Sequence, residues 1–272
     1  MPELPELEAV RLTIGPRIQG CTIEAVEVNP RKGFLLRSPI PTFQAEPAGR
    51  TIAAMWRRGK HLIFDLEGTD CRRLVINPML GGRFQLAAPK GKRLASTIFS
   101  FRLSSGDELR YLDFRDMGRV YWVRNLETEV PAWPELGPEA DSIAAEGIDW
   151  FRKRLRRYRA AIKDVLRDQA FLSGIGNAYS DEILFEARLL PLRRRSSLKP
   201  DDEQALFEAI TAVLANATQA ILANPNYEES KQDRSFMKVH GRGGETCPRC
   251  GHRISQIGSD REPLNFCRGC QF

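Results

Sequence analysis

The chain has 272 residues, of which 42% are hydrophobic, and this is enough for two domains with packed cores. We find no run of about 18 apolar residues and no basic stretch leading into an apolar one at the start, so we expect neither a membrane span nor a secretory signal and predict a cytoplasmic protein. The net charge of +6 fits a polyanionic partner without requiring one. The three histidines match no metal-site or triad spacing, which disfavours a histidine-dependent hydrolase.

The chain opens Met1-Pro2-Glu3-Leu4-Pro5-Glu6. Apolar residues then recur every three or four positions, at Leu4, Leu7, Val10 and Ile14. This spacing predicts a first helix of three to four turns, ending near Gly15-Pro16 or Gly20. Proline and glutamate are both common at an ordinary helix start, so the stretch alone does not indicate chemistry.

Removal of Met1 would turn Pro2 into a secondary amine that titrates at about 7.7–8 and is partly unprotonated at neutral pH. Such an amine can attack an electrophilic sugar carbon and form a cationic iminium, as a lysine Schiff base does. Glu3 and Glu6 lie beside it as candidate proton carriers. The positive end of the helix dipole would favour the unprotonated amine.

From residue 21 to about 125 the pattern changes to short β-branched and aromatic segments separated by Gly, Pro and charged turns. Seven strands are predicted: 22–28, 61–66, 73–76, 83–86, 96–103, 108–112 and 119–123. This spacing is typical of a β-sandwich or barrel.

Four prolines and glycines between 131 and 138 predict a linker, after which the period is helical, with helices expected over 148–169, 179–188 and 201–223. Residues 151–200 hold 13 Lys or Arg against 5 Asp or Glu, an excess of +8. The basic run Arg152–Arg159 fits either a solvated helix face or a phosphate contact, and the sequence leaves both open.

Four of the six cysteines lie in the last 26 residues, as Cys247-x2-Cys250, sixteen residues, and Cys267-x2-Cys270. This is the spacing of a closed four-thiolate zinc site, which leaves no open position for a substrate. We therefore predict one structural Zn²⁺ ion in a β-hairpin over 239–272. Cys21 and Cys71 are predicted to be buried as small hydrophobic residues.

Five motifs occur in one order along the chain: Pro2-Glu-Leu-Pro-Glu6, Arg58-Gly-Lys60, Asp113-x-Arg115 followed by Gly118, Gly174-Ile-Gly-Asn177-Ala-Tyr-Ser-Asp-Glu182, and the four-cysteine hairpin. In this combination the chain resembles the formamidopyrimidine-DNA glycosylase and endonuclease VIII family of base-excision repair enzymes. The resemblance spans nearly the whole chain. It implies an α+β multidomain fold: an N-terminal β-sandwich with a leading helix, a helix-two-turn-helix domain and a zinc-finger hairpin.

The resemblance also implies catalytic roles. Pro2 looks like the nucleophile that attacks C1′ of the damaged nucleotide, and Glu3 like the acid/base residue. Glu6 resembles the residue that supports the site, and Lys60 stands where the family has its cation and proton donor for strand cleavage. The implied activity is a bifunctional DNA glycosylase and apurinic-site lyase that removes oxidised or ring-opened bases, then cleaves the strand by β- or β,δ-elimination.

The implied partner is damaged double-stranded DNA, bound by a monomer, with no membrane. The target base must leave the helix, so the enzyme needs a pocket and side chains that fill the gap. Asn177 and the amides at a helix start are expected to hold a phosphate, with Lys163 as a second contact. We predict a catalytic domain over 1–130, a linker over 131–147, the helix-two-turn-helix domain over 148–236 and the zinc finger over 237–272.

Three segments depart from the family pattern. Asn77-Pro-Met-Leu-Gly-Gly82 replaces its usual His-Leu-Gly-Met-Ser-Gly, so the gap-filling role falls on Met79 or Leu80. After Arg115, expected to face the orphan base, Asp116-Met117 replaces Arg-Phe, although Met117 can still wedge between bases. In the hairpin the usual arginine position holds Glu262, and Arg261, one residue away, is the candidate for the catalytic and DNA contact.

The stretch from 224 to 247 looks shorter than the family segment that closes over 8-oxoguanine, which predicts a preference for ring-opened purines or oxidised pyrimidines. Three alternatives stay open at this point. One is an endonuclease VIII-like enzyme that prefers oxidised pyrimidines. Another is a catalytically impaired homologue that binds damaged DNA. The third is a zinc-ribbon protein that acts on RNA or protein partners and would bind in a salt-dependent way without a preference for damage.

Overall fold

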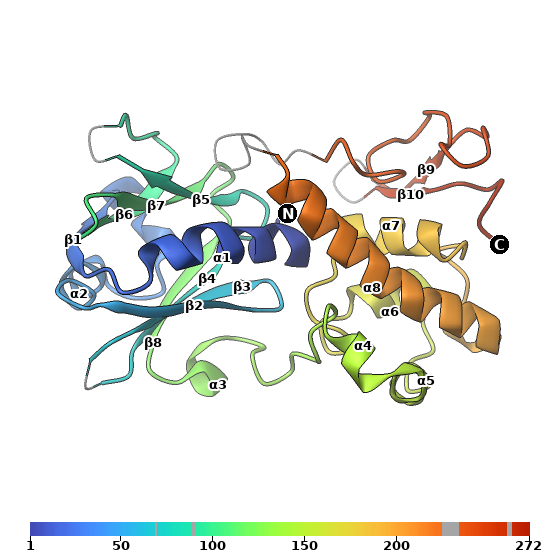
Figure 1. The fold of residues 1–272 in the computed structure, drawn as a ribbon, viewed down its shortest axis with the longest axis horizontal. Coiled ribbons are helices and arrows are strands. Elements are labelled where there is room, and N and C mark those ends of the chain that lie inside the picture. The colour runs from blue at the N-terminus through green and yellow to red at the C-terminus, as the bar shows by residue number, and fades with distance from the viewer. Residues whose placement is uncertain (69, 89–90, 225–233, 260–262) are drawn as a thin grey trace. The chain divides into compact units, whose positions relative to one another are not determined.

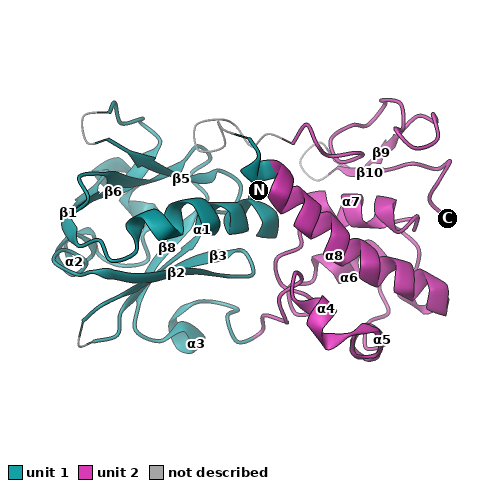
Figure 2. Ribbon diagram, viewed as in Figure 1, with its two compact units in different colours: residues 1–134, 221–232 teal, residues 135–220, 233–272 magenta. Residues whose placement is uncertain are grey.

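The computed structural model describes residues 1–68, 70–88, 91–224, 234–259 and 263–272. The chain divides into two compact units, shown in different colours in Figure 2. Unit 1 holds residues 1–134 and the end of the long helix after residue 220; unit 2 holds residues 135–220 and the described residues from 234 onward. The finer division predicted from the sequence, with a separate linker and zinc finger, stays a prediction.

Unit 1 contains two four-stranded antiparallel sheets (Figure 1). The first has the order β1 (Ile23–Val28), β6 (Thr97–Leu103), β7 (Glu108–Asp113), β5 (Gly82–Ala87). The second has the order β2 (Ile52–Arg58), β3 (His61–Leu66), β4 (Arg73–Asn77), β8 (Arg119–Val123). One buried hydrophobic cluster takes side chains from both sheets, which makes the unit a β-sandwich.

The helices of unit 1 are short except for the first. They are α1 (Leu4–Ile18), the 3₁₀ turn η1 (Pro30–Leu35), α2 (Ile40–Ala45) and α3 (Leu126–Glu129). The α1 residues Leu7, Val10, Ile14 and Ile18 belong to the same core cluster as the sheets. This packing fixes the helix, and so the chain start, against the sandwich.

All seven strands predicted for this region are present, with ends shifted by at most one residue. The sequence missed β2 because Ile52 is its one β-branched residue, and the alanines, methionine and arginines that make up most of the strand have weak strand preference. It also missed α2, a six-residue helix with a proline in its first turn.

Unit 2 is helical with one small hairpin. Its elements are α4 (Ile143–Glu146), α5 (Ile148–Leu155), α6 (Ile162–Arg167), α7 (Asn177–Glu186), η2 (Arg195–Ser197), α8 (Pro200–Leu222), β9 (Ser255–Ile257) and β10 (Leu264–Phe266). Strands β9 and β10 pair antiparallel, so the predicted hairpin is present.

The single helix predicted over 148–169 is wrong, because the chain forms α5 and α6 with a break between them. The break pairs with a distant segment: Ala161 forms a bridge with Arg194, and the Arg195 amide donates to the Ala160 carbonyl at 3.0 Å. The Arg195 Nε also donates to the Leu155 carbonyl at the end of α5, at 3.0 Å. Tertiary hydrogen bonds here replace the helical ones.

Helix α8 is long and apolar enough to cross a membrane when only its length and composition are considered. Its buried hydrophobic residues lie on one face, mostly three or four positions apart, at Leu206, Ala209, Ile210, Leu214, Ala217 and Ile221. A single apolar stripe of this kind is typical of a helix that packs one face onto a protein core.

Candidate functional site

The first residues of unit 1 form a compact acidic cluster at the start of α1. Pro2, Glu3 and Glu6 are all buried, with Glu3 2% and Glu6 3% exposed. Glu3 is the N-cap residue, and its backbone N–H donates to Glu6 Oε2 at 2.9 Å in a capping box. Pro2 therefore lies directly before the positive end of the helix dipole, as the sequence predicted.

Lys60 lies in the two-residue turn between β2 and β3, where Arg58 pairs with His61. Gly59 takes a φ of 54°, which only glycine adopts at low cost. The Arg57 guanidinium donates to the Gly59 carbonyl at 3.3 Å and to Glu8 of α1 at 3.1 Å. One arginine thus ties the turn that carries Lys60 to the first part of α1.

Glu8 is the acidic partner of Arg57 in this link. Burial acts to raise the pKa of its carboxyl, but hydrogen bonds and charge from Arg11 and Arg57 outweigh burial and lower it. Glu8 is therefore ionised at neutral pH, as its pairing with Arg57 at 3.1 Å requires.

Two loops at neighbouring strand ends carry the residues expected to enter the DNA. The loop between β4 and β5 holds Met79, partly buried with a φ of 45°, and Leu80, which is 46% exposed. The loop between β7 and β8 holds Arg115, which is exposed, and Met117, which is 42% exposed. These four side chains come from one end of the sandwich, because Gly82 at the start of β5 pairs with Asp113 at the end of β7.

The turn between α6 and α7 has the compact form expected of a helix-two-turn-helix. Gly174 takes a φ of 104°, and Gln169 holds the turn by accepting from the Gly174 amide at 3.0 Å and donating to the Ile175 carbonyl at 2.7 Å. Asn177 is the first residue of α7, and its side-chain amide donates to the Pro263 carbonyl at 2.9 Å. The helix start lies beside the end of the hairpin.

Lys163 of α6 is only 3% exposed, and its ammonium is ion-paired with Asp181 of α7. A buried ammonium needs such a partner. The predicted phosphate contact by Lys163 stays a prediction.

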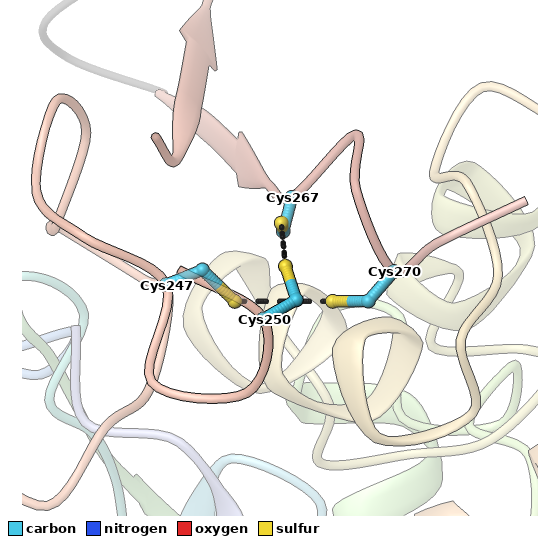
Figure 3. Close-up of side chains that lie close together, drawn as sticks. All are labelled: Cys247, Cys250, Cys267 and Cys270. Carbon is cyan, nitrogen blue, oxygen red and sulfur yellow. Dashed lines mark hydrogen bonds between the residues drawn. The ribbon is translucent and has the colours of Figure 1, made fainter. Parts of the chain in front are cut away.

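The four C-terminal cysteines meet in one cluster, with all four sulfur atoms within 4.8 Å of one another (Figure 3). The Sγ atoms of Cys247 and Cys270 are 3.8 Å apart, and those of Cys250 and Cys267 are 3.4 Å apart. A tetrahedral zinc ion with bonds of about 2.3 Å keeps its sulfur ligands about 3.8 Å apart. The cluster fits a four-coordinate metal ion.

The thiols of this cluster differ in acidity. Burial, together with the neighbouring thiols, raises the pKa of Cys270 to about 12. At Cys247 burial also acts to raise the pKa, but hydrogen bonds from the backbone amides of Arg249 and Cys250 and from the Cys267 and Cys250 thiols together outweigh it and lower the value to about 7. A divalent cation between the sulfurs would favour the thiolate form of all four.

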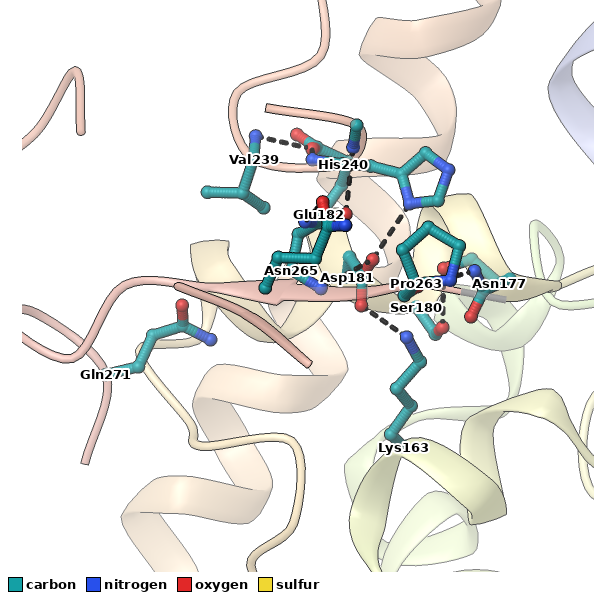
Figure 4. Close-up of polar contacts among 12 residues, drawn as sticks. Lys163, Asn177, Ser180, Asp181, Glu182, Val239, His240, Pro263, Asn265 and Gln271 are labelled. Atoms are coloured by element: carbon teal, nitrogen blue, oxygen red, sulfur yellow. Dashed lines mark hydrogen bonds and ion pairs between the residues drawn. The ribbon is translucent and has the colours of Figure 1, made fainter. Parts of the chain in front are cut away.

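A buried polar network joins α7 to the cysteine segment (Figure 4). The Glu182 carboxylate accepts the backbone amides of Lys238, Val239 and His240, each at 2.8 Å. The adjacent Asp181 carboxylate pairs with Lys163 on one oxygen, while its other oxygen bonds the His240 ring at 2.8 Å. These two carboxylates anchor the segment that leads into the cysteine cluster.

Arg261, predicted as a catalytic and DNA contact, lies outside the described residues, as do residues 225–233 of the segment compared with the 8-oxoguanine lid. The prediction that Cys71 is buried is wrong: the residue is exposed, in a short connection between β3 and β4. Cys21 is partly buried against the core of unit 1.

Sequence reasoning missed three features of the site. It gave no role to Asp113 or to the pair Asp181 and Glu182, although all three stand in the quoted motifs. It also passed over Phe114, which is 54% exposed and has the Arg83 Cζ atom 5.7 Å from the centroid of its ring. The available signal for Phe114 was an aromatic residue between Asp113 and Arg115 of the quoted motif.

Comparison with known proteins shows which family the sequence of this chain matches. Residues 1–120 match the formamidopyrimidine-DNA glycosylase N-terminal domain, and residues 136–223 match the formamidopyrimidine-DNA glycosylase H2TH domain. A protein of Heliobacterium modesticaldum named formamidopyrimidine-DNA glycosylase is 35% identical over 281 residues, covering all of both chains. One of Enterococcus faecalis with the same name is 34% identical and covers 100% of this chain and 97% of its own.

Solved structures agree. MutM in complex with DNA containing carbocyclic 8-oxo-G has a TM-score of 0.86 and 28% identity, with 99% of each chain covered. Lactococcus lactis Fpg in complex with DNA containing an oxidised pyrimidine has a TM-score of 0.85 and 29% identity, with the same coverage.

The chain belongs to the formamidopyrimidine-DNA glycosylase family. The predicted family and α+β fold class are confirmed, and so is the predicted enzyme class, a DNA glycosylase of base-excision repair.

Proposed function

We propose that this protein removes oxidised or ring-opened bases from duplex DNA with Pro2 as the nucleophile, and then cleaves the strand at the resulting site. The observation that carries this proposal is the buried Pro2 directly before the N-cap Glu3, in a chain that matches a formamidopyrimidine-DNA glycosylase over the whole of that protein. The nitrogen is an amide while Met1 is attached, so the proposal requires removal of Met1.

The chemistry follows from this geometry. The Pro2 amine adds to C1′, the glycosidic bond breaks, and the base leaves with the bonding electrons and takes up a proton. The sugar ring opens, so that C1′ and the Pro2 nitrogen share an iminium. Loss of a C2′ proton then expels the 3′ phosphate.

Glu3 is the proton carrier in this scheme, because it directly follows Pro2 in the chain and is buried at the same helix start. Glu6 holds Glu3 through the capping box. Lys60, in the turn tied to α1 by Arg57, supplies positive charge near the leaving groups.

The DNA is bound through two kinds of contact. The amides at the start of α7, with Asn177, face a phosphate, as helix N-termini favour. Met79 or Leu80 fills the gap left by the extruded base, while Arg115 and Met117 contact the opposite strand. Arg261 is kept as a candidate from its sequence position alone.

One zinc ion is the proposed resident of the cysteine cluster, with a structural role. The four residues Cys247, Cys250, Cys267 and Cys270 would hold it, and four thiolates fill its coordination. Bound there, the ion closes the hairpin and stabilises its fold.

A monomer acting in the cytoplasm, with no membrane partner, is the assembly we propose. For the lesion, the sequence favours ring-opened purines or oxidised pyrimidines over 8-oxoguanine. Excision from duplexes that carry each lesion tests this, and a clear preference for 8-oxoguanine would exclude it.

Borohydride trapping tests the nucleophile. The purified protein, with Met1 removal checked by mass, should form a covalent adduct on lesion and abasic duplexes. Pro2→Gly, and protein that retains Met1, should lose the adduct on lesion duplexes. A folded, correctly processed wild type that binds the duplexes and gives no adduct would favour the alternative, a damaged-DNA-binding homologue without catalysis.

A further inference from the structure

One buried carboxylate holds the backbone of a whole loop at the DNA-facing end of the sandwich. Asp113 ends β7 and is 1% exposed. Its Oδ1 accepts the amides of Arg115 at 2.8 Å and Asp116 at 3.1 Å. Its Oδ2 accepts those of Met117 at 3.0 Å and Gly118 at 2.6 Å. Four consecutive amides therefore converge on one side chain.

The same carboxylate reaches the second loop. The Phe114 amide donates to the Gly81 carbonyl at 3.2 Å. A Cβ atom on Gly81 would lie 2.3 Å from Asp113 Oδ1, and one on Gly118 would lie 2.2 Å from the Tyr111 hydroxyl and 2.9 Å from Asp113 Oδ2. Both glycines are thus required by close packing around the carboxylate, and the two loops are fixed to each other.

These two loops carry exposed side chains at this end of the sheet, among them Leu80, Phe114, Arg115 and Met117. Side chains that enter a base stack bind more tightly when their backbone is already ordered, because ordering it on binding costs free energy. A mobile loop would pay this cost at each encounter with DNA.

We propose that Asp113 is a positioning residue for base recognition: it preorganises both loops so that their side chains enter the duplex together. The inference rests on the proposed function, and it concerns a residue that acts through others and touches no reacting atom. Position 113 then needs a carboxylate because the loop amides require two acceptor oxygens, and not because DNA binding requires a negative charge there.

The test is Asp113→Asn, which keeps the shape but replaces one acceptor by an NH₂ group facing two amide donors. Asp107→Asn is the matched control, since it removes the same charge at the other end of β7. Gly118→Ala is a second disruption of the same packing, made without changing charge.

Single-turnover excision is measured on lesion duplexes with each of the four opposite bases, alongside borohydride trapping on a preformed abasic duplex. Asp113→Asn and Gly118→Ala should excise the lesion about tenfold or more slowly. In both variants the excision rates on duplexes with the four different opposite bases should differ less from one another than they do in the wild type. The rate of borohydride trapping on the abasic duplex should change by less than about threefold. The amides of 115–118 should exchange hydrogen faster in both variants, and Asp107→Asn should match the wild type.

Three results would overturn the inference. In the first, Asp113→Asn excises as the wild type does. In the second, lesion excision and abasic trapping fall by the same factor, which indicates a role in folding alone. In the third, the 115–118 amides stay protected in Asp113→Asn. A wild type that traps no DNA would instead refute the proposed function, and the inference with it.

Discussion

Glu3 combines a structural and a proposed chemical role in one side chain. As the N-cap residue it joins Glu6 in a capping box, so the helix start itself sets the position of the carboxylate. Such a box needs an acceptor oxygen at Glu3, whereas proton transfer needs an ionisable group. The two roles can therefore be separated by one substitution.

Glu3→Gln should stop base removal while leaving cleavage of preformed abasic sites, because the amide oxygen still accepts the capping hydrogen bond but the amide can neither take up nor release a proton at neutral pH. The free energy of unfolding should change by less than about 1 kcal/mol. Excision and abasic cleavage on gels, with thermal unfolding of both proteins, measure this. Normal lesion excision by the variant would refute the role given to Glu3.

At the scale of elements, the position of the hairpin depends on α7 more than on its own short strands. Strands β9 and β10 have three residues each, too few for independent stability. The Glu182 carboxylate supplies what they lack, since it accepts three successive amides just before the cysteine segment. Asn177 adds a link from the helix start to Pro263.

Glu182→Gln should destabilise this attachment by about 2–3 kcal/mol, because a buried charged acceptor of three amides becomes neutral and partly mismatched. Hydrogen exchange at 238–240 should rise and DNA affinity should fall. Glu186→Gln is the control: that residue lies on the same helix, but its side chain is 37% exposed and pairs with Lys238 and Arg249 at the surface. Equal effects of the two substitutions would refute the anchor.

The sequence predicted elements well where the local pattern is strong, as in the three-to-four spacing of apolar residues in α1 and the β-branched and aromatic runs of seven strands in the sandwich. It failed where distant segments decide the structure. The break between α5 and α6 depends on pairing with residues 194–195, which no local pattern reports. The sequence identified the motif residues by type and spacing. That four backbone amides converge on Asp113 is seen only in the three-dimensional path of the loop.

At the scale of the whole molecule, the basic residues of the run 152–159 fall into two classes, those held by contacts within unit 2 and those that are exposed. Within the run 152–159, Arg152 pairs with Glu203 at 3.4 Å, and Arg154 donates to the Phe171 carbonyl at 2.7 Å. The exposed members are Lys153, Arg156, Arg157 and Arg159. Part of the run therefore stabilises unit 2, and the exposed part is what remains available for phosphates.

Metal removal should affect the two units differently, since the buried core of unit 1 lies within that unit and the cysteine cluster lies in unit 2. Chelation, or Cys250→Ser, should raise hydrogen exchange over 234–259 and 263–272 and weaken DNA binding. Tryptophan fluorescence should change little, because Trp56, Trp122 and Trp133 lie in unit 1 and Trp150 of unit 2 lies in α5, outside the cysteine segment. Cys71→Ser, at an exposed cysteine outside the cluster, should behave as the wild type, and added Zn²⁺ should reverse chelation. Unchanged DNA affinity after verified metal loss would refute the structural role of the ion, because a hairpin that keeps its form without the metal has no need of four thiolate ligands.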